Sequence, residues 1–73
     1  MDPASTGNGA PHLNARDVEL LRHLAAGRST SQIAVAMAIS GNTVRTRIHR
    51  VAGKLAVTSR VDAVRTAEAR GFL

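Results

Sequence analysis

The stretch from Ser29 to Leu55, STSQIAVAMAISGNTVRTRIHRVAGKL, decides the fold. Ser29 followed by Gln32 forms a capping box, because each side chain can satisfy a backbone N–H of the first helical turn. This pair predicts a short helix over about Thr30 to Met37, in which Ile33 and its apolar neighbours repeat at helical spacing. The stretch therefore opens on a short amphipathic helix.

A three-residue turn joins this helix to a longer one. Ser40 is a good N-cap residue and predicts a helix from Gly41 to about Leu55. Only Ala38, Ile39 and Ser40 then remain between the two helices, and so short a turn makes them cross steeply. That geometry is typical of a helix-turn-helix. An ordinary helical hairpin is the alternative, and the turn alone does not separate the two.

The remaining chain predicts one helix on each side of this pair. Asn14 can cap a helix from about Ala15 to Ala26, and Ser59 with Asp62 predicts one from about Arg60 to Arg70. Residues 1–12, MDPASTGNGAPH, lack apolar periodicity and predict a disordered tail. The 73-residue chain is thus expected to be one all-α, four-helix domain over residues 13–73.

The charges are distributed unevenly along the chain. The formal net charge is +5, and no acidic residue occurs between Leu20 and Val61. That segment carries seven of the basic residues: Arg22, Arg28, Arg45, Arg47, Arg50, Lys54 and Arg60. A surface of one sign favours a polyanion as partner. Charge alone leaves a merely solvated basic surface equally possible.

The predicted helix from Gly41 to Leu55 separates into faces when its residues are spaced about 100° apart. One stripe is apolar and suits a core: Val44, Ile48, Val51 and Leu55. The opposite stripe is polar: Asn42, Arg45, Thr46, His49 and Gly53. Thr43, Arg47, Arg50 and Lys54 line the flank between them. Arg, Thr, Asn and His can read base edges in the major groove, and a flank of Arg and Lys suits phosphates.

Other classes of function fit these residues less well. The apolar stripe lacks the aromatic residues that are typical of a membrane-surface helix. Proteins that bind single-stranded nucleic acid stack its bases on aromatic side chains, and this chain has a single aromatic residue, Phe72. His49 has no partner at metal-ligand spacing, so neither a metal site nor a cofactor is expected. No phosphate loop, nucleophile–base pair or carboxylate pair is present, which argues against an enzyme. The absence of a signal or membrane-spanning pattern predicts a cytoplasmic, nucleoid-associated protein.

Several segments resemble the LuxR/GerE-type DNA-binding domain. They are LNARD from Leu13, GRSTSQIA from Gly27, ISGNTVR from Ile39 and KLAVTSRVDAV from Lys54. The resemblance covers residues 13–73 and implies a four-helix transcriptional regulator that binds double-stranded DNA, usually as a dimer on two half-sites. Only twelve residues precede the domain and Met1 opens the chain, so we expect a free-standing regulator in preference to an effector domain cut from a longer protein.

The resemblance also implies roles for individual residues. It assigns the bases to Arg45, Thr46 and His49. It assigns the DNA backbone to the start of the second helix and the basic flank: Thr30, Ser31, Thr43, Arg47, Arg50 and Lys54. Asn42 is added because backbone N–H groups at a helix N-terminus attract phosphate. The resemblance makes the fourth helix the homodimerisation element. With Val61 and Val64 expected in the core, the exposed edge for that contact would be Ala63, Thr66 and Arg70.

The sequence departs from the family pattern in several places. Ala38 and Ala56 stand where the family usually has Gly, and each costs on the order of 1 kcal/mol if the chain there is left-handed. Asp17 stands for a usual Glu, and its shorter side chain is expected to weaken an internal pairing with an Arg such as Arg47 or Arg60.

A rival hypothesis is a helical protein-interaction module that docks on RNA polymerase or another regulator. The apolar residues of the fourth helix keep it open, and titration with duplex DNA separates the two.

Overall fold

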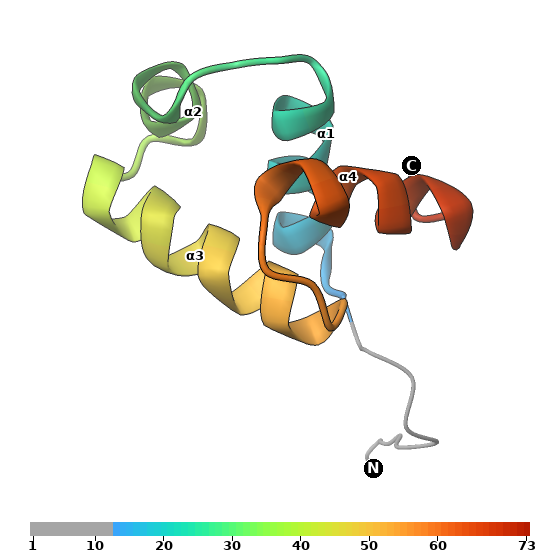
Figure 1. Ribbon diagram of the computed structural model, residues 1–73. Helices are drawn as coiled ribbons and strands as arrows, with labels where there is room; N and C mark the ends of the chain where they lie inside the picture. The colour runs from blue at the N-terminus through green and yellow to red at the C-terminus, as the bar shows by residue number, and fades with distance from the viewer. Residues whose placement is uncertain (1–12) are drawn as a thin grey trace, which may run out of the picture.

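The computed structural model describes residues 13–73, which form four helices and no strand. They are α1 (Ala15–Ala25), α2 (Thr30–Met37), α3 (Gly41–Lys54) and α4 (Arg60–Ala69) (Figure 1). The predicted all-α, four-helix fold is confirmed, and α1, α3 and α4 each end one residue earlier than predicted. The tail expected over residues 1–12 lies outside the described residues. Within 13–73, no helix has the length and apolar character needed to cross a membrane.

Each helix begins at the capping residue expected from the sequence. The side-chain oxygens of Asn14, Ser29, Ser40 and Ser59 accept hydrogen bonds of 2.9–3.1 Å from the backbone N–H three residues on. In α1 and α2 the reciprocal bond of the capping box is also present. These caps satisfy N–H groups that have no partner within the helix, so the four starting points follow from local sequence.

All four helices end in the same hydrogen-bond arrangement, the Schellman motif. In each, one residue is left-handed, and the N–H groups of that residue and the next bond back to carbonyls three and five residues earlier. Gly27 and Gly71 take the left-handed position after α1 and α4, with φ of 76° and 80°. Ala38 and Ala56 take it on either side of α3, with φ of 57° and 60°. Both alanines therefore have the left-handed conformation considered for them from the sequence, and this conformation is strained for a residue with a Cβ.

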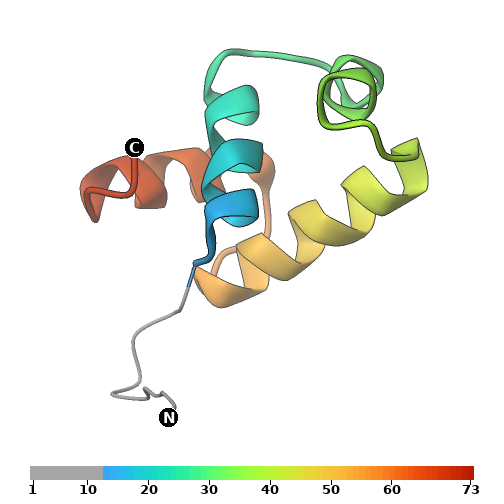
Figure 2. The same ribbon diagram turned by 180° about the vertical axis from the view of Figure 1, so that it is seen from behind.

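α1 packs against α4 and α3, and α3 also packs against α2 and α4 (Figures 1 and 2). The core is made by the side chains that they bury between them: Leu20, Leu21, Leu24, Ile33, Met37, Val44, Val51, Leu55, Ala63 and Ala67. Val44, Val51 and Leu55 of the predicted apolar stripe are buried, and Ile48 packs partly buried against them. The inner face of α3 is thereby fixed against the rest of the domain.

The orientation of α4 differs from the prediction. Ala63 was placed on the exposed edge but is only 1% exposed, whereas Val61 was placed in the core and is 58% exposed. Val64 is partly buried and Ala67 is fully buried. Both apolar rows, Val61–Val64 and Ala63–Ala67, have helical spacing. The row of small residues faces inward because α4 packs against both α1 and α3, and alanine allows close approach.

Candidate nucleic-acid interface

The candidate interface is the outer face of α3 together with the start of α2. Arg45, Thr46 and His49, the residues predicted to read bases, are all exposed on α3. Among the predicted backbone contacts, Ser31, Asn42 and Arg50 are exposed, and the others are half-buried: Thr30, Thr43, Arg47 and Lys54. The structure thus presents the predicted polar stripe to solvent, with the core stripe on the opposite side of the helix.

The first turn of α3 is cross-linked by its own side chains. The Asn42 side-chain oxygen accepts a hydrogen bond of 3.1 Å from Nη1 of Arg45. The Thr46 hydroxyl donates to the Asn42 carbonyl at 3.0 Å, and the Ser40 hydroxyl donates to that of Thr43 at 2.9 Å. An arginine has five N–H donors, so the bond to Asn42 orients the Arg45 side chain and leaves donors free for a ligand.

Lys54 forms a salt bridge with Asp17 of α1. Its Nζ lies 2.7 Å from Oδ2 of Asp17, whose side chain is 3% exposed, while that of Lys54 is 30% exposed. The same carboxylate oxygen accepts the Asn14 backbone N–H at 3.2 Å. Among residues 13–73 the salt bridge of Asp17 is with Lys54, and not with Arg47 or Arg60, the arginines considered as partners from the sequence. Lys54 is the last residue of α3, and its ammonium meets the buried carboxylate in the first turn of α1.

Arg60 was not among the residues predicted to contact DNA, but the structure brings it to the start of α2. Nη2 of Arg60 donates a hydrogen bond of 3.2 Å to the Thr30 hydroxyl, although 30 residues separate the two in the chain. Thr30 in turn lies close to α3, because a Cβ added at Gly41 would be 4.0 Å from Thr30 Cγ2. No local pattern in the sequence signals this contact; it depends on how α4 returns across α1.

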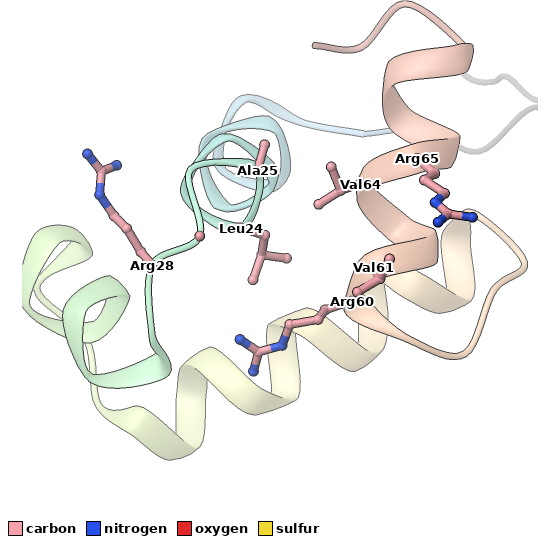
Figure 3. A pocket seen from close by; sticks show the side chains of 8 residues that line it. Leu24, Ala25, Arg28, Arg60, Val61, Val64 and Arg65 are labelled. Atoms are coloured by element: carbon pink, nitrogen blue, oxygen red, sulfur yellow. The ribbon is translucent and has the colours of Figure 1, made fainter.

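A groove of about 340 Å³ lies between the end of α1 and the start of α4 (Figure 3). Its lining is aliphatic and basic: Leu24, Ala25, Gly27, Arg28, Arg60, Val61, Val64 and Arg65. Beside it, Nη1 of Arg28 lies 2.8 Å from Nδ1 of His23. This lining contains no carboxylate and no nucleophilic side chain.

Comparison with known proteins identifies the family. The family model GerE, described as bacterial regulatory proteins of the luxR family, matches residues 11–67. The chain belongs to the luxR family. It is 40% identical over 55 residues to a probable transcriptional regulatory protein NarL from two strains of Mycobacterium tuberculosis, CDC 1551 and H37Rv. That match covers 75% of this chain and 26% of the relative, so the chain spans about a quarter of the relatives' length.

Two solved structures share the architecture. One is the response regulator ChrA of a heme-sensing two-component system, with a TM-score of 0.82 and 30% identity over 99% of this chain and 33% of that one. The other is VqmA of Vibrio cholera in a complex with ligand and DNA, with a TM-score of 0.77 and 29% identity over 99% of this chain and 31% of that one. The family resemblance noted in the sequence is thus confirmed.

Proposed function

We propose that this chain binds double-stranded DNA in sequence-specific fashion, as a transcriptional regulator or the DNA-binding part of one. In the proposed complex α3 enters the major groove, Arg45, Thr46 and His49 contact base edges, and the surrounding polar and basic residues contact phosphates. The observation that carries the proposal is the exposed polar stripe of α3, on a helix fixed from behind by its apolar stripe. The solved complex of VqmA with DNA supports it.

Electrostatics support the same partner. The segment from Leu20 to Val61 has no acidic residue, and it includes all of α2 and α3. A duplex approaching α3 therefore meets only positive or neutral side chains from these two helices. Lys54 is the weakest of the predicted phosphate contacts, because its ammonium already pairs with the buried Asp17 carboxylate.

Replacing Arg45 tests the assignment of the reading face. Preferred sites are first selected from random duplex DNA, and affinities are then measured by fluorescence anisotropy on a preferred and a shuffled duplex. Arg45→Ala is expected to cost about 1–3 kcal/mol on the preferred duplex and much less on the shuffled one. Arg22→Ala is the matched control, since it removes an exposed arginine from α1. If Arg45→Ala weakens binding equally on both duplexes, Arg45 does not read bases.

We also propose that two copies bind two half-sites through α4, on a face different from the one first expected. Ala63 is buried within its own domain. The exposed residues Val61, Arg65 and Glu68 share one face, at spacings of four and three residues. In a two-fold contact this face meets itself, so Arg65 of one copy can pair with Glu68 of the other.

Charge reversal tests the dimer. Arg65→Glu is expected to weaken assembly of two copies on a two-half-site duplex, and the double variant Arg65→Glu/Glu68→Arg to restore it. Sedimentation velocity of the protein–DNA complex reads the stoichiometry. A stoichiometry that none of these substitutions changes would exclude the face.

The exposed Val61 and the groove beside it favour one other function, a docking module for RNA polymerase or another regulator. A pure docking module binds no duplex DNA, so the titration above separates the two.

A further inference from the structure

Arg60 is a cation with no carboxylate of residues 13–73 within salt-bridge distance. Within residues 13–73 the ion pairs join His23 to Glu19 and Lys54 to Asp17, and neither involves Arg60. Its side chain is exposed, and its observed hydrogen bond goes to a neutral hydroxyl, that of Thr30, at 3.2 Å. One of five guanidinium N–H donors is used in this bond. The remaining donors and the full positive charge are available to an anion.

Arg60 is connected to the proposed reading face of α3 through Thr30 and Gly41. Thr30 lies between Arg60 and α3, with its hydroxyl toward the former and its methyl group toward Gly41. A Cβ at Gly41 would be 4.0 Å from that methyl group and 3.9 Å from Nη1 of Arg45. Figure 3 shows the Arg60 side chain extending from α4 toward α2 and α3, whereas Arg65 points the opposite way. The Arg60 guanidinium is therefore at the margin of the surface that would face DNA.

We infer that Arg60 is a further DNA-backbone contact and that it shares one phosphate with Thr30. The inference rests on the proposed function. The Thr30 hydroxyl accepts from Arg60, so its own O–H is free to donate to a phosphate oxygen, while the guanidinium donates to another. This contact adds α4 to an interface otherwise made by α2 and α3, and it holds the phosphate next to the groove edge that Arg45 approaches. Such a contact positions the protein without reading sequence.

The salt dependence of binding tests the inference. Arg60→Gln keeps a donor for Thr30 but removes the charge. It is expected to weaken binding about tenfold on preferred and shuffled duplexes alike, and to reduce the log–log salt slope by about one unit. Arg60→Lys is expected to keep the slope, because the charge remains. Arg22→Gln, the control on α1, is expected to leave the slope unchanged.

Three results would overturn the inference, and they differ in what else they exclude. An unchanged slope for Arg60→Gln beside a reduced slope for Arg50→Gln would remove Arg60 from the interface and leave the proposed function in place. A wild-type protein that binds no duplex at any salt concentration would exclude both. A slope that falls for Arg60→Lys as much as for Arg60→Gln would show that the guanidinium acts through the fold and not through its charge.

Discussion

Replacing the two left-handed alanines with glycine is expected to stabilise the domain. A left-handed L-residue costs about 1–2 kcal/mol, and Ala38 and Ala56 both hold this conformation, with φ of 57° and 60°. Glycine removes the strain, but it also makes the unfolded chain more flexible. This flexibility lowers the free energy of unfolding by about 0.4–1 kcal/mol. The net gain is about 0.5–1 kcal/mol for each substitution. Because α3 separates the two positions by 14 helical residues, or roughly 20 Å, the gains are expected to add.

Urea denaturation followed by far-UV circular dichroism measures these gains, since the chain has neither Trp nor Tyr for fluorescence. Ala36→Gly is the matched control, because Ala36 is an exposed residue with ordinary helical geometry two positions before Ala38. The same chemical change there is expected to destabilise the domain by about 0.5–1 kcal/mol. If Ala38→Gly and Ala36→Gly destabilise equally, the strain assigned to Ala38 does not exist.

Two further substitutions test the packing behind α3. Lys54→Met leaves the buried Asp17 carboxylate without its cation and is expected to destabilise the domain by about 3 kcal/mol, against less than about 0.5 kcal/mol for exposed Arg70→Met in the same urea series. Equal losses would mean that the pair contributes nothing. Ala63→Leu is expected to cost about 1–3 kcal/mol by overpacking the contact of α4 with the core, whereas Ala69→Leu on the exposed side is tolerated. A thermal melt in which both variants match the wild type would contradict the observed orientation of α4.

Local signals predicted most of the fold. Each helix start could be predicted because a capping side chain bonds the backbone only three residues away. The faces of α3 followed from its strongly segregated residue types. In α4 the same reasoning failed, because two apolar rows compete and side-chain size in the packed core decides between Ala63 and Val61.

The contacts that sequence reasoning missed join distant segments. Lys54 and Asp17 are 37 residues apart, and Arg60 and Thr30 are 30 apart. Which cation reaches which partner depends on how α1 and α4 pack against the other helices, and no local spacing encodes that. The exposed face of α3 was therefore predictable from the sequence, and the contact between Arg60 and Thr30 was not.

The central claim is that α3 reads the sequence of duplex DNA. The most direct measurement is an anisotropy titration of the wild-type chain with a duplex obtained by selection and with a shuffled duplex of equal composition, at a series of salt concentrations. The selected duplex is expected to bind on the order of a thousandfold more tightly than the shuffled one, and both affinities are expected to fall steeply with salt. Equal affinities for the two duplexes, or no binding to either, would contradict the central claim.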